Sequence, residues 1–250
     1  MIFCAGLGTR LKPLTDTMPK ALVPLAGKPL LQWQVEKLRD AGITDIIVNV
    51  HHFPDMIIDT IRRNEGWGCN IMISDERDLL LDTGGGLRKA QRLLIQNSKF
   101  KIQNEPILAC NVDILSNIDL RELIDSYTSC SSRYSSLVVS ERETQRYLCF
   151  DKGDRLCGWT NVKTGEVKPK DLSIQYSVFR KLAFSGMQIL SPEVLARLKE
   201  MPESKFSMID FYLKVMGEVE LKAYVPKDYR MMDVGKIDQI EEAERFAESL

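Results

Sequence analysis

The chain begins with Met1-Ile2-Phe3-Cys4-Ala5, an apolar run that leads directly into Gly6-Leu7-Gly8-Thr9-Arg10. The run predicts a short strand, and the glycines after it predict a loop whose backbone N–H groups can approach an anion closely. Arg10 adds a planar group with several donors that suits a phosphate, and Lys20 supplies a second positive charge ten residues later. This opening therefore predicts an α/β fold with an anion-binding loop after its first strand.

Two other kinds of glycine loop do not match this stretch. The dinucleotide-binding pattern G-x-G-x-x-G requires a third glycine where the chain has Leu11, and the P-loop pattern G-x-x-x-x-G-K-[ST] is absent. A plain turn between a strand and a helix would account for the two glycines alone. Arg10, Pro19 and Lys20 in the same stretch favour phosphate binding over that simpler interpretation.

Apolar runs and helical patterns alternate along the first part of the chain. We predict strands at residues 1–5, 45–50, 69–74, 106–111 and 136–140, and helices at residues 29–41, 54–63, 85–94 and 120–127. Strands that alternate with helices form parallel β-α-β units. The strand at 45–50 lacks a regular polar alternation, as strands buried on both faces do. We therefore expect a mostly parallel sheet with helices on both faces.

The pattern changes after about residue 141. Short strands at 147–151, 156–161 and 165–167 surround two glycine-containing turns, which is typical of antiparallel pairing. Further strands are predicted at 183–189 and 221–225, and helices at 192–199, 206–216 and 237–248. Since no repeat or linker interrupts the chain, we interpret residues 1–250 as one domain with two halves, 1–140 and 141–250.

Composition excludes several classes of partner. Of the 250 residues, 44% are hydrophobic and 28% are charged, which is ordinary for a globular protein, and the formal net charge is −1. A near-neutral chain offers no basic field for nucleic acid or an anionic membrane. There is no charged leader before an apolar stretch, and no run reaches the roughly 20 residues of a membrane span. We expect a cytoplasmic protein without nucleic-acid or membrane partners.

Three further motifs follow predicted strands or precede predicted helices. Asp82-Thr83-Gly84-Gly85-Gly86 lies before a predicted helix, whose first N–H groups would attract negative charge unless Thr83 merely caps a flexible turn. Asn111-Val112-Asp113 ends a buried strand, where ligands of α/β sheets bind. Asp113 could hold Mg²⁺ there or cap the next helix. Met232-Asp233-Val234-Gly235 carries a second carboxylate.

Together these motifs resemble a known family. The ordered series Gly6-Leu7-Gly8-Thr9-Arg10-Leu11, Pro13-Leu14-Thr15, Pro19-Lys20-Ala21-Leu22-Val23-Pro24 and Gly27-Lys28-Pro29 is similar to the signature of sugar-1-phosphate nucleotidyltransferases. The resemblance implies a Rossmann-like fold of the GT-A type, with a mostly parallel sheet and a small antiparallel region on the acceptor side. Residues 1–140 would then form the nucleotide-binding half, and residues 141–250 the sugar-phosphate-binding half.

The resemblance also implies roles for individual residues. It assigns catalysis to Arg10, Lys20 and Asp113, and binding of Mg²⁺ to Asp113 and Asp233. The nucleotide would contact Ala5, Gly6, Gly8, Thr9, Arg10, Lys20, Asp82, Thr83, Gly84 and Gly85, and the sugar would contact Asn111, Ser185 and Gly186. The chain departs from the family pattern at Val112, where glycine is common, and at Lys236, where threonine is usual. A lysine that binds the sugar phosphate is also expected, with Lys168, Lys170 and Lys181 as candidates.

The reaction implied is transfer of a nucleotidyl group from a nucleoside triphosphate to a sugar 1-phosphate, which supplies or recycles precursors of cell-wall or surface glycans. The segment 82–86 is most similar to that of N-acetylmuramate 1-phosphate uridylyltransferases, so UTP is favoured. A guanylyltransferase for mannose or heptose 1-phosphate is the alternative. A cytidylyltransferase of the isoprenoid or sugar-acid type and a non-catalytic sensor of nucleotide sugars are further alternatives. The sequence leaves the oligomeric state open and allows a homo-oligomer.

Overall fold

The computed structural model describes residues 1–96, 105–129, 134–170 and 179–250. Its strands are β1 (Ile2–Phe3), β2 (Pro24–Leu25), β3 (Lys28–Pro29), β4 (Asp45–Val50), β5 (Asn70–Asp75), β6 (Ile107–Asn111), β7 (Ile114–Ser116), β8 (Ser135–Ser140), β9 (Arg146–Phe150), β10 (Leu156–Asn161), β11 (Glu166–Lys168), β12 (Arg180–Leu190), β13 (Leu221–Tyr224) and β14 (Met231–Asp233). Its α-helices are α1 (Leu30–Asp40), α2 (Pro54–Arg63), α3 (Asp82–Gln96), α4 (Leu120–Ser129), α5 (Pro192–Leu198), α6 (Met208–Val215) and α7 (Ile240–Glu248).

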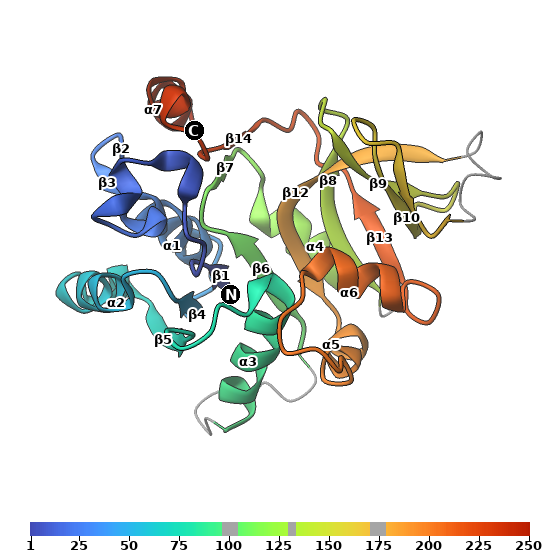
Figure 1. Cartoon of the computed structure of the whole chain (residues 1–250), viewed down its shortest axis with the longest axis horizontal. Helices are drawn as coiled ribbons and strands as arrows, with labels where there is room; N and C mark the ends of the chain where they lie inside the picture. The colour runs from blue at the N-terminus through green and yellow to red at the C-terminus, as the bar shows by residue number, and fades with distance from the viewer. Residues whose placement is uncertain (97–104, 130–133, 171–178) are drawn as a thin grey trace.

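One ten-stranded sheet organises the described residues (Figure 1). Its main path has the order β11-β10-β9-β12-β6-β1-β4-β5, and β8 joins at β12 while β13 joins at β8. The strands β6, β1, β4 and β5 are parallel, whereas β12 runs antiparallel to β6, β8 and β9. The predicted α/β class is confirmed, with a parallel region in the first half of the chain and an antiparallel region in the second.

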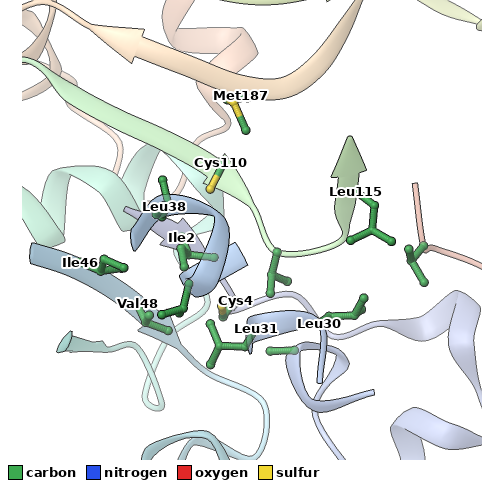
Figure 2. Packing of buried hydrophobic residues seen from close by; sticks show 14 of the residues in the cluster. Ile2, Cys4, Leu30, Leu31, Leu38, Ile46, Val48, Cys110, Leu115 and Met187 are labelled. Atoms are coloured by element: carbon green, nitrogen blue, oxygen red, sulfur yellow. The ribbon is translucent and has the colours of Figure 1, made fainter. Parts of the chain in front are cut away.

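Both faces of the sheet are covered, as the sequence predicted. Ile2 and Cys4 pack with Leu30, Leu31 and Leu38 of α1 in one apolar cluster (Figure 2). The same cluster includes residues of α2, α4 and α7. Met1 and Phe3 pack into a second cluster with residues of α3, α5 and α6. Successive residues of a strand point to opposite faces, so the burial of all four places β1 in the centre of the fold.

The sequence did not predict every pairing. The run at 136–140 follows the parallel units in the chain, but as β8 it pairs with β12 and β13 rather than with β6. Two small sheets, β14-β7 and β2-β3, were missed because their strands have only two or three residues. Such short strands carry no periodicity, and the partners β7 and β14 are also far apart in the chain. Within the described residues, no helix has both the length and the apolar character needed to cross a membrane.

The start of α3 differs from the predicted start. The helix begins at Asp82 rather than at Gly85, so its first five residues include three glycines. A Cβ added to Gly84 would lie 2.4 Å from the ring of Phe206, and one added to Gly85 would lie 2.4 Å from the carbonyl oxygen of Ser204. These glycines therefore allow the segment before α6 to pack directly on α3.

This packing predicts the effect of Gly84→Ala. Alanine is the better helix former, yet we expect the variant to lose about 1–3 kcal/mol of unfolding free energy because its methyl group meets Phe206. Denaturant titration measures this loss. Gly217→Ala is the matched control, because a Cβ there would meet nothing within 4 Å. Equal stability of the two variants would contradict the packing described here.

Candidate active site

The predicted anion loop connects β1 to a short 3-10 helix at Thr9–Leu11. Gly8 adopts a φ of +64°, and a Cβ there would lie 2.8 Å from Cγ2 of Thr15, so both backbone and space require glycine. The Gly8 carbonyl oxygen accepts hydrogen bonds from the N–H of Leu11 and the hydroxyl of Thr15, both at 2.8 Å. Gly6 is exposed, and a Cβ there would meet nothing within 4 Å. The loop is thus held firmly at Gly8 and open at Gly6.

A cleft of about 240 Å³ lies beside this loop, at the carboxyl ends of β1 and β6. The predicted site residues that line it are Gly6, Gly8, Thr9, Arg10, Lys20, Thr83, Asn111 and Asp113, together with Phe3, Cys4, Val112 and Gly235. The predicted residues Ala5, Asp82, Gly84, Gly85, Ser185, Gly186 and Asp233 are outside this lining.

The four charged residues predicted for the site form two ion pairs. Nζ of Lys20 pairs with Oδ2 of Asp113, and their side chains are only 10% and 19% exposed. Arg10 approaches Asp233 at 3.7 Å between Nη2 and Oδ2, and both of these side chains are about half exposed. Each predicted phosphate-binding cation is therefore paired with one of the two predicted metal-binding carboxylates.

Pairing of β7 with β14 brings the two aspartates to the same place. Asp233 lies opposite Ile114, the residue after Asp113, and the N–H of Val234 donates to the Asp113 carbonyl oxygen at 2.8 Å. Gly235 leaves room for the guanidinium of Arg10, because a Cβ there would lie 2.7 Å from Nη2. Lys236, the departure from the family pattern, leaves this arrangement of Asp233 intact.

The donor set fits a magnesium ion that is shared with a substrate. Within the described residues, no group of three or more histidine, cysteine, aspartate or glutamate side chains could hold a metal by itself. Asp113 and Asp233 supply two carboxylates beside an open cleft. Mg²⁺ commonly takes one or two protein carboxylates and completes its coordination with substrate phosphates and water.

The start of α3 corrects one expectation. The N–H groups of Gly84 and Gly85 were expected to be free for an anion, but both donate to the carbonyl oxygen of Phe206, at 2.9 and 3.2 Å. The N–H of Thr83 donates to Oδ1 of the exposed Asp82 at 2.6 Å. A role for this segment at the nucleoside remains a prediction, and Thr83 is the residue that reaches the cleft.

The surroundings of Gly186 also differ from those expected. The sequence suggested that a sugar approaches its backbone, but a Cβ at Gly186 would lie 2.7 Å from Nδ2 of Asn111. The space that this glycine leaves is therefore filled by the Asn111 side chain, while Ser185 is fully buried. Asn111 is the residue of this group that lines the cleft.

The chain matches the family model described as nucleotidyl transferase over residues 1–249. It is 29% identical over 235 residues to the N-acetylmuramate alpha-1-phosphate uridylyltransferase of Caulobacter vibrioides, covering 91% of this chain and 88% of that protein. It is also 29% identical over 239 residues to mannose-1-phosphate guanyltransferase 2 of Candida glabrata, covering 94% of this chain and 61% of that protein.

Solved structures share the fold. HddC from Yersinia pseudotuberculosis complexed with GMP-PN has a TM-score of 0.73 at 24% identity, covering 98% of this chain and 97% of that one. UDP-glucose pyrophosphorylase from Acinetobacter baumanii has a TM-score of 0.73 at 17% identity, covering 97% and 90%. Because the family model spans nearly the whole chain, this protein belongs to the nucleotidyl transferase family, which confirms the family predicted from its sequence.

Proposed function

We propose that this nucleotidyltransferase transfers a nucleotidyl group from a nucleoside triphosphate to a sugar 1-phosphate, with release of pyrophosphate, and that it requires Mg²⁺. The proposal rests on two ion pairs at one cleft: Lys20 pairs with Asp113, and Arg10 pairs with Asp233. A site that joins two anionic substrates needs both cations and metal-binding carboxylates. Arg10, Lys20 and Asp113 line this cleft, and Asp233 pairs with Arg10 beside it. The names of both relatives described above state the same chemistry.

The proposed reaction does not require the protein to transfer a proton. A sugar 1-phosphate is largely dianionic at neutral pH because its second pKa is about 6, so its oxygen attacks the α-phosphorus without a protein base. The new bond forms to the α-phosphorus as the bond to the pyrophosphate oxygen breaks. Catalysis then depends on alignment and on compensation of charge.

The cationic residues supply that compensation. Lys20 and Arg10 line the cleft on the side of the glycine loop, where they would exchange their aspartate partners for phosphate oxygens of the triphosphate. Arg10 would stabilise the negative charge that develops on the departing pyrophosphate. When bound to Asp113 and Asp233, Mg²⁺ would reduce the repulsion between the two anionic substrates.

Lys168 is the candidate that we propose for the sugar phosphate. Its Nζ lies 5.4 Å from the centre of the Trp159 ring and 3.9 Å from Oδ1 of Asp210, at the start of α6. The first residue of α6, Met208, donates its N–H to the Thr83 hydroxyl at 3.0 Å. These contacts connect Lys168 to the part of the cleft lining at Thr83.

We propose UTP and an N-acetylmuramate-like sugar phosphate as the substrates. The sequence of residues 82–86 supports this choice, as does the uridylyltransferase of Caulobacter vibrioides, which covers most of this chain. GTP with mannose or heptose 1-phosphate is the second candidate, supported by the guanyltransferase of Candida glabrata. A non-catalytic sensor is disfavoured by the intact set of charged residues at the cleft.

If Arg10 stabilises the departing pyrophosphate, its removal should lower kcat and leave binding of the sugar phosphate nearly unchanged. We expect Arg10→Ala to lower kcat by roughly 100-fold to 1,000-fold, because one donor to a developing charge is removed, with little change in KM for the sugar phosphate. Pyrophosphate release measures both quantities. Arg62→Ala is the matched control, since Arg62 also pairs with an exposed aspartate but lies on α2. An Arg10→Ala enzyme with unchanged kcat would refute this role.

Substitution of either aspartate should lower activity, but the two variants should differ in stability. We expect Asp113→Asn and Asp233→Asn each to lower turnover by about 100-fold or more, because the metal contributes several kcal/mol to the transition state. Only Asp113→Asn should also lower the melting temperature, since it leaves Lys20 with little solvent and no partner. Near-normal pyrophosphate release from both variants would overturn the metal assignment.

The choice of base is tested by a binding panel. We expect UTP with Mg²⁺ to raise the melting temperature more than GTP, dTTP or CTP, because at equal concentration the ligand that binds more tightly stabilises the folded state more. Pyrophosphate release with N-acetylmuramate 1-phosphate and mannose 1-phosphate then separates the two sugar classes. A larger shift with GTP would favour the guanylyltransferase, and no turnover across the panel would favour the sensor.

A further inference from the structure

A buried carboxylate lies behind the cleft, outside the residues assigned above. Glu76, next to the end of β5, is only 1% exposed, and its neighbour Asn49 on β4 is only 2% exposed. Oε1 of Glu76 accepts from Nδ2 of Asn49 at 2.8 Å, and Oε2 accepts from the N–H of Leu81 at 3.3 Å. Both donors are neutral, and burial raises the pKa of this carboxyl above its usual range. Burial of a carboxylate is costly unless its hydrogen bonds are satisfied.

Asn49 extends the hydrogen bonds toward the glycine loop. Its Oδ1 accepts from the N–H of Cys4 at 2.8 Å, while its Nδ2 is the donor to Glu76. Both ends of this amide are therefore fixed, and it cannot rotate without losing a bond at each end. The result is a continuous connection from Cys4, through Asn49 and Glu76, to Leu81.

Both ends of this connection lie next to residues that line the cleft. Cys4 itself lines the cleft and lies two residues before Gly6, and Leu81 immediately precedes the first turn of α3, where Thr83 lines the cleft. Glu76 itself is held in place by its backbone. Its N–H donates to the Val50 carbonyl oxygen at 2.7 Å, and its own carbonyl oxygen accepts from Leu79 at 3.0 Å.

The contact between Asn49 and Glu76 also explains why a glycine is needed at position 86 of α3. A Cβ at Gly86 would lie 2.7 Å from Oε1 of Glu76 and 2.9 Å from Nδ2 of Asn49. Gly84 and Gly85 face the segment at Phe206 instead. Gly86 therefore has a separate function in this fold, because it lets α3 lie directly against the bond between Asn49 and Glu76.

We propose that Asn49 and Glu76 form a positioning pair that sets the separation between the glycine loop and the start of α3, and thereby the affinity for the nucleoside triphosphate. The proposal rests on the proposed function in placing the triphosphate in this cleft. Neither side chain lines the cleft, so the pair acts through Cys4 and Leu81 and not by touching the substrate. Glu76 would thus have a positioning role, although the chemical step does not use its carboxylate.

Single substitutions should break the connection at known bonds. In Glu76→Gln, one oxygen becomes an NH₂ group that must face either Asn49 Nδ2 or the N–H of Leu81, so one buried donor loses its acceptor. In Asn49→Asp, two carboxylates face each other. We expect each variant to raise the dissociation constant of the triphosphate about tenfold, the effect expected for one buried donor left unsatisfied.

The double variant Asn49→Asp with Glu76→Gln should restore binding. The carboxylate introduced at position 49 would accept from the N–H of Cys4 with one oxygen and from the new amide NH₂ at position 76 with the other. The amide oxygen at position 76 would accept from the N–H of Leu81. All the bonds are then satisfied with the direction of the middle one reversed. Recovery in the double variant, after loss in each single variant, assigns the loss to the bond between these two side chains.

The experiment measures binding and turnover on the folded full-length chain. Calorimetry with UTP and with GTP, each with Mg²⁺, gives dissociation constants for the wild type, both single variants and the double variant, and pyrophosphate release gives kcat and KM for the sugar phosphate. We expect weaker binding of the triphosphate in the single variants, little change in KM for the sugar phosphate, and recovery to within about threefold in the double variant.

Gln91→Met is the matched control. Gln91 is also buried, and its Nε2 donates to the Leu195 carbonyl oxygen at 3.1 Å, away from the cleft. The control should lower stability without changing triphosphate binding. Wild-type binding in Glu76→Gln, or loss that the double variant does not recover, would overturn the positioning pair. If the wild type releases no pyrophosphate with any triphosphate and sugar phosphate, the proposed function itself is wrong, so the two failures are distinguishable.

Discussion

The position of β1 between β4 and β6 determines where every group of the cleft lies. Phe3 pairs with Asn49 on one side and with Asn111 on the other, in two parallel registers. Parallel strands end at the same edge of a sheet, so the glycine loop, Asn49 and the segment at Asp113 all emerge together. Because residues of β1 are buried on both faces, a shift in its register would expose apolar side chains and separate these groups at the same time.

The electrostatics of the cleft follow from this convergence. Lys20 and Asp113 have little solvent around them, so their mutual attraction is weakly screened and each would be costly to leave unpaired. Arg10 and Asp233 are well solvated, and such pairs contribute little to stability. Both pairs would exchange partners when the substrates bind. Only Lys20 and Asp113, however, need the incoming phosphate and Mg²⁺ to replace a partner that is shielded from solvent.

Local patterns in the sequence located the helices and the strands of the main sheet, through apolar runs and helical periodicity. The family signature indicated Arg10, Lys20, Asp113 and Asp233, and the structure pairs them as two ion pairs, while their roles remain predictions. Sequence could not indicate the link between Asn49 and Glu76, because those residues are 27 positions apart and become partners only when β4 and β5 pair. The contact of Gly84 with Phe206 depends on a still more distant segment.

The three glycines of α3 show how one motif can satisfy separate constraints. Gly84 and Gly85 admit the segment before α6, which belongs to the second half of the chain, while Gly86 admits the pair of Asn49 and Glu76 from the first half. Thr83 is thereby positioned from both directions, since its hydroxyl accepts from Met208 and its chain follows the anchored Leu81. The wall of the cleft at Thr83 is consequently shared by the two halves, so a displacement of α6 would alter the space available beside the glycine loop.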